Sequence, residues 1–398
     1  MIGAGPAGLI AADVLSRAGA RVTVFDHKPS PARKFLMAGR GGLNLTHSEP
    51  LEIFLTRYGA ATERLEPIIR AFPPERLREF CSELGEETFI GTSGRVFPKS
   101  FKASPLLRAL LARLRAQGVR FERGAFEGFV GDNALLLRGP GDESRALAPD
   151  VAVLALGGAS WPRLGSDGGW TRSFDALGVA IAPLAPANCG ALIRWSEHFQ
   201  GAFEGQPIKT ILLRHAAAAA RGDLVVTRAG LEGGPAYALA SSLRAEVERG
   251  GGATLIIDLR PDTSAAELAR KLEREKGKQS LATFLRKTIK LAKIETALLR
   301  EASPLGLPRE SEALAELIKN IPLGVTGVAG FERAISTSGG VRFDELDAAL
   351  MLKKRPGVFL AGEMLDFDAP TGGYLLQAAF STGFAAGQGA ARYLGLTA

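Results

Sequence analysis

The sequence predicts an α/β fold in which both ends of the chain build one domain and the middle forms an insertion. Three features support this prediction. Residues 3–8 (GAGPAG) precede a helix and then a strand. Residues 151–156 (VAVLAL) are a continuous apolar run, which is typical of a buried parallel strand. Residues 357–361 (GVFLA) predict another short strand, and the helix expected over 374–393 is rich in small residues that allow close packing on a sheet.

Length and composition limit the class of protein. A chain of 398 residues suits two or three domains. Hydrophobic residues make up 46% and charged residues 23%, which is ordinary for a globular protein. Because no run of about 18 uncharged apolar residues occurs, we expect neither a transmembrane helix nor a membrane partner. The sequence leaves the oligomeric state open.

The cysteines and histidines exclude two kinds of site. Cys81 and Cys189 lie far apart, which excludes a disulfide framework and the usual dithiol relay. The four histidines show no ligand spacing, so we expect no metal site. Together these features indicate a reducing, cytoplasmic compartment.

The glycine-rich turn at the start of the chain predicts dinucleotide binding. Gly3 makes the tight turn, Gly5 lets the backbone approach a pyrophosphate, and Gly8 allows close packing of helix and strand. The helix start then faces the phosphate charge. Asp26 closes the next strand, where its carboxylate suits the adenosine ribose hydroxyls. The alternative is a structural glycine turn with a surface aspartate.

The first strand is short in this sequence. Only Met1 and Ile2 precede Gly3, whereas a strand of this fold usually has about five residues. We therefore expect the strand to begin upstream, or the chain to be truncated.

The C-terminal block distinguishes FAD from NAD, which the first motif does not. An acid after the strand at 357–361 suits the ribityl or pyrophosphate part of FAD, with Glu363, Asp366 and Asp368 as candidates. The helix that starts after Gly373 points free amides toward the flavin ring, where negative charge develops on reduction. The alternative is an ordinary acidic loop.

The middle of the chain differs from its two ends in the pattern of predicted helices and strands. Helices are expected over 51–84, with a break at 73–74, and over 104–117; strands are expected over 119–138. Beyond residue 183, short strand-like runs surround a helix at 236–248, and 264–320 is helical and rich in Lys and Leu. We therefore divide the chain into a discontinuous Rossmann domain (1–185 and 325–398), a β-rich insert (186–262) and a helical insert (263–324).

Several motifs in fixed order resemble one known family. GAGPAG, AGRGGLNLTH, GRVFP, LALGGASWPRLGSDG, STSGGV and AGEMLDFDAPTGGY are similar to those of the HI0933-like flavoproteins, which include aminoacetone-oxidase-like and bile-acid-reductase-like members. The resemblance implies a Rossmann-type, glutathione-reductase-like FAD-binding domain with an inserted β-barrel-like part and a helical part. It also implies FAD contacts at Gly3, Gly5, Gly8, Asp26, Lys34, Gly41, Asn44, Gly157, Gly339, Glu363, Asp366 and Gly373.

The chain also departs from the family pattern. Arg40 precedes the glycine pair and Leu43 stands where many members have Cys. Arg228 stands where His is common, and Glu232 is an additional change. These departures suggest a subfamily with a different substrate.

The leading functional hypothesis is an FAD-dependent oxidoreductase acting on a small organic substrate. No second G-x-G-x-x-G follows a strand, so NAD(P)H is expected to reduce the flavin directly. Arg95 and Lys102 are candidates for orienting an anionic or carbonyl-bearing substrate, and Tyr374 for covering the ring or donating a proton. Trp161 and Trp170 are candidate pocket walls. The alternatives are ordinary loop cations and packing aromatics.

Two other functions stay open. Residues 270–293 carry nine Lys or Arg and two Glu. A helix is expected over 281–300, with Arg286, Lys290 and Lys293 on one of its faces. Such a basic surface suits RNA, and the resemblance includes a dihydrouridine synthase acting on ribosomal RNA. A solvated helix face explains the same charges. A non-enzymatic flavin-binding regulator is the other alternative.

Overall fold

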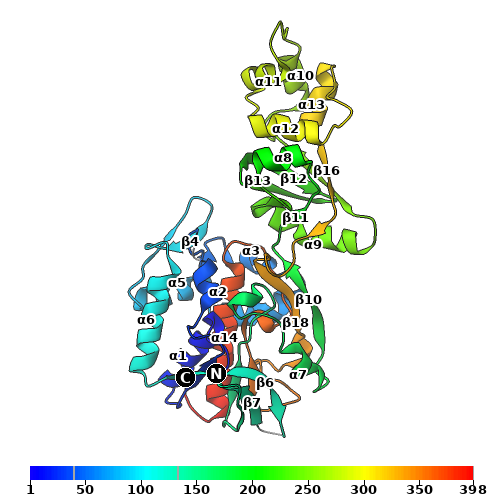
Figure 1. The fold of residues 1–398 in the computed structure, drawn as a ribbon. Coiled ribbons are helices and arrows are strands. Elements are labelled where there is room, and N and C mark those ends of the chain that lie inside the picture. The colour runs from blue at the N-terminus through cyan, green and yellow to red at the C-terminus, as the bar shows by residue number, and fades with distance from the viewer. Residues whose placement is uncertain (39–40, 132–133, 398) are drawn as a thin grey trace. The chain divides into compact units, whose positions relative to one another are not determined.

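The computed structural model describes residues 1–38, 41–131 and 134–397. The chain forms two compact units (Figure 1). The first unit comprises Met1–Pro186 and Ile335–Ala398, and the second comprises Ala187–Ala334. Both ends of the chain therefore belong to one unit, as the sequence predicts.

A parallel sheet forms the centre of the first unit. β1 (Thr23–Asp26) pairs with β5 (Arg120–Arg123), and β9 (Ala152–Leu154) pairs with β19 (Val358–Leu360). Ile2 bridges both halves, because it makes parallel bridges to Phe25 and to Leu154. The order is thus β5, β1, Ile2, β9, β19, which is the doubly wound order of a Rossmann fold. Ile2 alone occupies the central strand position.

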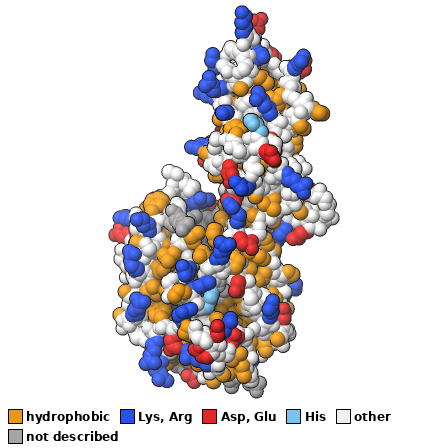
Figure 2. Space-filling view, in the orientation of Figure 1, with side chains coloured by type: hydrophobic (Ala, Val, Ile, Leu, Met, Phe, Trp, Pro, Cys, Tyr) orange, Lys and Arg blue, Asp and Glu red, His pale blue; other side chains and the backbone are white. Residues whose placement is uncertain are grey.

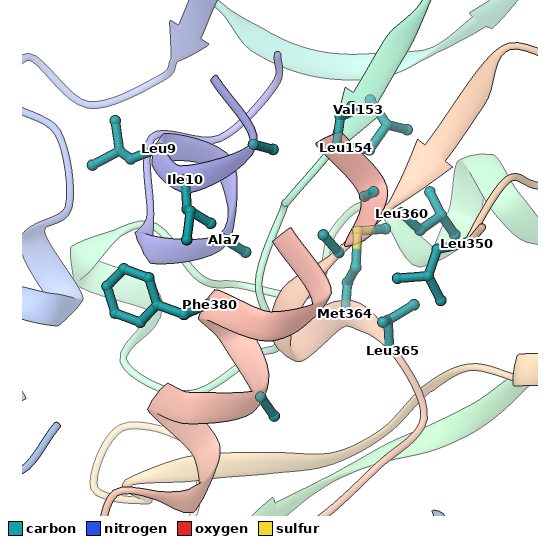
Figure 3. Packing of buried hydrophobic residues seen from close by; sticks show 14 of the residues in the cluster. Ala7, Leu9, Ile10, Val153, Leu154, Leu350, Leu360, Met364, Leu365 and Phe380 are labelled. Atoms are coloured by element: carbon teal, nitrogen blue, oxygen red, sulfur yellow. The ribbon is translucent and has the colours of Figure 1, made fainter. Parts of the chain in front are cut away.

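Two helices cover this sheet and pack closely on each other. These are α1 (Pro6–Arg17) and α14 (Tyr374–Tyr393), blue and red in Figure 1. A Cβ at Gly383 would lie 2.3 Å from the Ala7 carbonyl oxygen, and one at Gly387 would lie 3.1 Å from Ala11 Cα. Figure 3 shows the apolar residues of α1, of β9 and β19, and of α14 in the surrounding core. Small residues on α14 therefore set the spacing of the two helices.

The contacts between the two helices also fix their direction. Gly383 of α14 contacts Ala7 of α1, and Gly387 contacts Ala11. The contacts thus advance by four residues in the same direction along both helices, so the two helices are parallel. Tyr374 lies nine residues before Gly383, whereas Pro6 lies one residue before Ala7. The start of α14 is therefore displaced from the start of α1 by eight residues, or about 12 Å.

The remaining helices of the first unit follow the predicted pattern with two exceptions. The helix expected over 51–84 is interrupted a first time between Thr56 and Thr62, where a 3-10 turn lies. The stretch from Lys34 onward, expected to be irregular, begins within the short helix α2 (Arg33–Ala38). The break expected at 73–74 is confirmed, since Pro73 caps the helix that starts at Pro74. The other elements are α3 (Leu51–Thr56), η1 (Gly59–Ala61), α4 (Thr62–Ala71), α5 (Pro74–Glu83), α6 (Ala103–Ala116), η2 (Pro162–Leu164), α7 (Thr171–Asp175), η3 (Phe343–Glu345) and η4 (Gly362–Met364).

Three small sheets complete the first unit. β2 (Thr46–His47), β4 (Arg95–Pro98) and β3 (Thr88–Ile90) pair in that order and antiparallel. A second antiparallel sheet is a meander of β6 (Ala125–Val130), β7 (Ala134–Arg138) and β8 (Ser144–Leu147). β10 (Ile181–Ala187) pairs with β18 (Ser336–Val341).

The second unit is built on a seven-stranded antiparallel sheet. Its order is β16–β15–β12–β13–β14–β11–β17. Within the residues that the structure describes, β16 and β17 stand at opposite ends of this order and are not paired, so a closed barrel is not confirmed. The strands are β11 (Ala191–Leu192), β12 (Pro207–His215), β13 (Ala218–Thr227), β14 (Gly230–Glu232), β15 (Ala253–Asp258), β16 (Ile321–Val325) and β17 (Gly327–Val328).

The division of the chain differs from the expected one in two respects. Residues 325–334, assigned from sequence to the Rossmann domain, belong to the second unit, because β16 and β17 complete its sheet by pairing with β15 and β11. The expected inserts at 186–262 and 263–324 share one buried cluster that includes Leu255 of β15 and Leu298 of α12 (Lys293–Glu301). They therefore form one unit.

The helices of the second unit correct one sequence prediction. The helix expected over 281–300 is two helices, α11 (Leu281–Ile289) and α12 (Lys293–Glu301). Lys290 adopts a left-handed conformation with φ of 56° and ends α11, so Arg286, Lys290 and Lys293 do not share one helix face. The other helices are α8 (Glu197–Phe203), α9 (Gly234–Glu248), α10 (Ala265–Leu272) and α13 (Ser311–Lys319).

Candidate functional site

The three glycines at the start of α1 differ in the space that a side chain would have. Gly3 has φ of 99°, and a Cβ there would lie 2.2 Å from the Ala155 carbonyl oxygen. A Cβ at Gly8 would lie 2.0 Å from the Gly3 carbonyl oxygen. A Cβ at Gly5, in contrast, would meet no heavy atom within 4 Å. Gly3 and Gly8 are thus required by packing, whereas Gly5 borders open space at a helix start, where an anion is favoured.

Asp26 lies beside this turn at the end of β1. Its Oδ2 accepts a hydrogen bond from the Ala4 amide at 2.9 Å, and its Oδ1 accepts one from the Lys28 amide at 2.8 Å. The carboxylate is therefore held against the turn, as expected for a residue that positions a bound ribose beside a phosphate-binding helix start.

Lys34 and Glu363 form the ionic centre of the candidate site. Lys34 Nζ lies 2.5 Å from Glu363 Oε2 and also donates to Ser160 Oγ. Glu363 Oε1 accepts from the Thr337 amide at 3.1 Å, and Oε2 accepts from the Gly158 amide at 3.3 Å. Lys34 and Glu363, which are 329 positions apart in sequence, thus form a direct ion pair.

Thr337 is a site residue that the sequence analysis missed. Its side-chain oxygen accepts hydrogen bonds from the Ala159 amide at 2.8 Å and the Ser160 amide at 3.0 Å. A Cβ at Gly158 would lie 2.4 Å from this oxygen. The motif STSGGV contains Thr337, but only the fold reveals that its hydroxyl holds the loop after β9.

The start of α14 provides a second place for a ligand. Gly373 has φ of 99°, and a Cβ there would lie 2.5 Å from Thr46 Cα, so the helix start lies directly against the backbone of β2. Two buried oxygens close by in sequence, Asn44 Oδ1 and Thr46 Oγ1, have no hydrogen-bond partner among the described residues. Since buried polar atoms are normally paired, these oxygens fit a polar ligand such as the flavin of FAD.

The other predicted cofactor contacts differ in how closely they are packed. A Cβ at Gly339 would lie 2.2 Å from the Pro183 carbonyl oxygen, and one at Gly157 would lie 2.8 Å from Ser166 Oγ. Gly41 borders open space with respect to the described residues, since a Cβ there meets none of their atoms within 4 Å. Burial raises the pKa of Asp366, and nearby Arg342 opposes this effect. Arg40, which departs from the family pattern, lies outside the described residues.

Tyr374 is buried in a cluster of its own. Its hydroxyl donates to Glu49 Oε1 at 2.6 Å, and its ring stacks on His47 with centroids 5.6 Å apart. Arg57 donates to the other Glu49 oxygen at 2.6 Å. Burial and the bond to Glu49 raise the pKa of Tyr374. Burial would also raise the pKa of Glu49, but the hydrogen bonds from Arg57 and Tyr374 outweigh it and lower that pKa. This arrangement favours the packing interpretation of Tyr374.

The remaining candidates divide between surface and core. Arg95 and Lys102 are exposed, and within the described residues neither side chain has a hydrogen-bond or ion-pair partner. Trp170 is buried and donates to the Gly157 carbonyl at 2.9 Å, so it supports the loop from inside. Trp161 is partly exposed with φ of 59°, a strained conformation for a large residue. Figure 2 shows hydrophobic side chains on the face of the first unit that carries α1, α2 and α14.

Comparison with known proteins establishes the family. The model of the HI0933-like protein Rossmann domain matches residues 1–389. The chain belongs to this family. The match confirms the resemblance found in the sequence, and with it the prediction of a flavoprotein oxidoreductase.

HI0933-like relatives with assigned activities cover nearly the whole chain. A 3-dehydro-bile acid delta(4,6)-reductase of Clostridium scindens is 27% identical over 410 residues, covering 98% of each chain. A ribosomal RNA dihydrouridine synthase of Haemophilus influenzae is 24% identical over 397 residues, covering 97% of this chain and 96% of its own. Among solved structures, a 3-ketosteroid-delta4-(5alpha)-dehydrogenase of Rhodococcus jostii has a TM-score of 0.53 at 17% identity, covering 98% of this chain and 95% of its own. This last similarity concerns the fold.

Neither a membrane-spanning helix nor a metal-binding cluster is found among the residues that the structure describes. No helix there combines the length and the apolar character that a membrane crossing requires. No cluster of three or more His, Cys, Asp or Glu suited to a metal ion occurs in the same part of the chain.

Proposed function

We propose that this oxidoreductase binds FAD across the starts of α1 and α14, takes electrons directly from NAD(P)H and reduces a carbon–carbon double bond in a small organic substrate. One observation carries the proposal. The two helices run the same way in one unit, and their starts are displaced from each other by about 12 Å along the helix axis. Two sets of free amides at this separation suit an extended ligand with phosphates at one place and a ring that gains negative charge at another.

The side chains around the two helix starts have distinct roles in this proposal. The open space at Gly5 would admit the pyrophosphate, and Asp26 would bind the ribose hydroxyls. Lys34 and Glu363 would hold the ribityl or pyrophosphate part between the two helix starts. The unpaired oxygens of Asn44 and Thr46 would bond to polar groups of the ring.

The chemistry then divides between cofactor and protein. When bound, FAD supplies hydride transfer, which side chains alone do not perform. The free amides at the start of α14 would stabilise negative charge next to them without rearranging, because the helix already orients them. Tyr374 would position this helix start through its bond to Glu49 rather than donate a proton.

The substrate class rests on the relatives. The bile acid reductase aligns along the full length of both chains, which supports reduction of a double bond in a small, largely apolar molecule. The departures at Leu43, Arg228 and Glu232 suggest that the substrate itself differs.

The test is spectroscopic and uses the purified full chain. We expect a yellow protein that releases FAD on denaturation, and anaerobic bleaching of its flavin by NADH or NADPH. Reoxidation by enones, but not by their saturated analogues, would support the substrate class. A protein that binds no FAD would contradict the proposal. A bound flavin that neither nicotinamide reduces would indicate a non-enzymatic flavin-binding regulator instead.

A second candidate is the reduction of uridine in ribosomal RNA. Two observations favour it: the similarity to a ribosomal RNA dihydrouridine synthase, and the exposure of every Lys and Arg within 270–293 except Lys271. Figure 2 shows these cation-rich elements, α10 and α11, at one end of the second unit. The test is RNA affinity as a function of salt, with Arg286, Lys290 and Lys293 replaced together by Ala. Unchanged affinity would remove this candidate.

A further inference from the structure

One segment of the first unit leads from the beginning of α1 to the beginning of α14. It starts at Gly362, where a Cβ would lie 3.0 Å from Ala7 Cβ and where the amide donates to Thr382 Oγ1 at 3.0 Å. It ends at Gly373, which caps α14 nine residues before Thr382. We call residues 362–373 the connecting segment. Because it joins the two helix starts, it borders the place that we propose for FAD.

Asp366 lies on the connecting segment with a fixed backbone and a free carboxyl group. Its amide donates to the Val341 carbonyl oxygen at 3.0 Å. The neighbours Leu365 and Phe367 are buried, and Leu365 packs in the core (Figure 3). Within the described ranges, the partly buried carboxyl group of Asp366 has no hydrogen bond or ion pair, whereas that of Glu363 has both. The fold thus positions Asp366 without using its carboxyl group.

The proposed reaction needs an acid as well as a hydride. Reduction of a carbon–carbon double bond adds one hydride and one proton, and the cofactor supplies the hydride. The proton must come from water or from a positioned acid such as a His, Asp, Glu, Lys or Tyr side chain. The titratable groups that the fold gathers around the two helix starts therefore decide which residue provides it.

The other titratable groups around the helix starts already have partners. The Tyr374 hydroxyl donates to Glu49, and burial together with this bond raises the pKa of Tyr374. The Nδ1 atom of His47 accepts from the Glu49 amide at 3.1 Å, so the ring proton lies on Nε2, which is 3.0 Å from a backbone carbonyl oxygen. Lys34 is paired with Glu363. None of these groups offers a proton that is free of a protein acceptor.

Asp366 also differs from the other acids in its protonation. Burial raises the pKa of its carboxyl group, and the charge of Arg342, which follows β18, opposes this effect without cancelling it. The other Asp and Glu residues with a shifted pKa, among those that the structure describes, have a lowered one. A carboxyl group with a raised pKa keeps its proton closer to neutral pH, as general acid catalysis requires.

We propose that Asp366 is the acid that protonates the substrate. The double bond gains a hydride at one carbon, with both electrons coming from NAD(P)H through the cofactor. The electron pair released from the double bond takes the proton of the Asp366 carboxyl group at the neighbouring carbon, and water returns a proton to the carboxylate. This inference rests on the proposed function, since it names the proton donor of that reaction.

Rapid-mixing spectroscopy of the FAD-loaded full chain tests the inference, because it separates flavin reduction by NAD(P)H from flavin reoxidation by an enone. The probes are 2-cyclohexen-1-one and 4-androstene-3,17-dione. Asp366→Asn should slow reoxidation by about 100-fold or more, the range of a general acid, and leave flavin reduction and FAD affinity unchanged. Asp366→Glu keeps an acid and should recover part of the rate. Asp150→Asn makes the same chemical change at an exposed residue of the first unit and should alter none of these quantities.

Two pH titrations give readouts that a purely structural role of Asp366 would not move. Reoxidation of the wild type should slow as pH rises through the folded pKa of Asp366, because only the protonated carboxyl group donates, and Asp366→Asn should lack this pH dependence. In NMR spectra of the full chain with carbon-13 in the aspartate carboxyl groups, one signal should be missing from Asp366→Asn. In the wild type that signal should titrate at higher pH than those of the other aspartates.

Several outcomes would overturn the inference. Weaker FAD binding with an unchanged reoxidation rate in Asp366→Asn would make this residue a cofactor contact. The same pH dependence of reoxidation in wild type and Asp366→Asn would assign the proton to another group or to water. If thermal melts show that Asp366→Asn is unfolded, Asp366→Glu replaces it, and a rate and pH profile identical to those of the wild type refute the role.

The same preparations separate this inference from the proposed function. A chain that holds no FAD, a flavin that NAD(P)H does not bleach, or a reduced flavin that neither enone reoxidises would refute the proposed function, and the inference with it. A flavin that is reduced and reoxidised as expected, at the same rates in wild type and Asp366→Asn, would refute the inference alone.

Discussion

Replacing Gly5 by Ala should weaken FAD binding and leave the stability of the protein without FAD almost unchanged. Gly5 has φ of −80° and ψ of −179°, which any residue adopts, and its Cβ would touch no protein atom. Reduced freedom of the unfolded chain favours Ala by about 0.4–1 kcal/mol. Ala is a poorer helix cap than Gly by a similar amount, so the two effects offset. We expect the free energy of unfolding without FAD to change by less than about 1 kcal/mol.

The affinity for FAD should fall, in contrast, because the new methyl group occupies the open space beside Gly5, where we propose that the pyrophosphate lies. Loss of one charge-assisted hydrogen bond between an amide and a phosphate costs about 1.5–3 kcal/mol. This corresponds to a Kd roughly 10- to 100-fold higher. With FAD at about 100 times the wild-type Kd, the cofactor stabilises the wild type by about 2.7 kcal/mol and the variant by only about 0.4–1.4 kcal/mol.

The assay combines FAD titration of the apoprotein, followed by flavin fluorescence, with urea unfolding in the presence and absence of FAD. Gly201→Ala is the matched control. Gly201 lies within α8 in the second unit and also borders open space, so Ala should stabilise the fold by about 0.5–1 kcal/mol and leave FAD affinity unchanged. If Gly5→Ala binds FAD as tightly as the wild type does, the pyrophosphate does not lie at this turn and the argument fails.

Three other substitutions test the site and its support. Glu363→Ala should lower the free energy of unfolding by about 2–4 kcal/mol, because Lys34 and two backbone amides lose their partner; urea unfolding measures this. Glu49→Gln should cost about 1–2 kcal/mol at pH 7 through the bonds from Arg57 and Tyr374. Because the folded-state pKa of Glu49 is lowered, this contribution is present above the ordinary carboxyl range and is lost as pH falls through the folded value. Gly383→Ala should destabilise by about 3 kcal/mol, because its Cβ would overlap the backbone of α1, and thermal melts report the loss.

Each of these expectations has an outcome that contradicts it. Glu363→Gln retains an acceptor oxygen for one of the two amides, so a loss as large as that of Glu363→Ala would show that this hydrogen bond contributes nothing. A Glu49→Gln effect that is the same at pH 3 and pH 7 would mean that the carboxylate charge plays no part. If Gly383→Ala were as stable as Gly201→Ala, the close packing of α1 on α14 would not be required.

The local sequence determined much of the fold, because its signals need only neighbouring residues. The turn at 3–8 has a defined glycine spacing, residues 151–156 are a continuous apolar run, and the helix at 374–393 is rich in small residues. The structure confirms these elements and places them in one parallel sheet with its covering helices. The resemblance to the family implies Lys34 and Glu363 as separate cofactor contacts, but it does not predict the ion pair between them.

Three features were decided only by tertiary packing. The strands around 321–328 look apolar in isolation, and only pairing with β15 and β11 assigns them to the second unit. Lys290 ends a helix that periodicity would continue to 300, because the buried faces of α11 and α12 point into one core. The hydroxyl of Thr337 holds the loop after β9 across a sequence separation of 178 residues. Sequence patterns encode how a segment folds with its neighbours, whereas pairing of distant segments depends on which surfaces meet, and that information is spread over the whole chain.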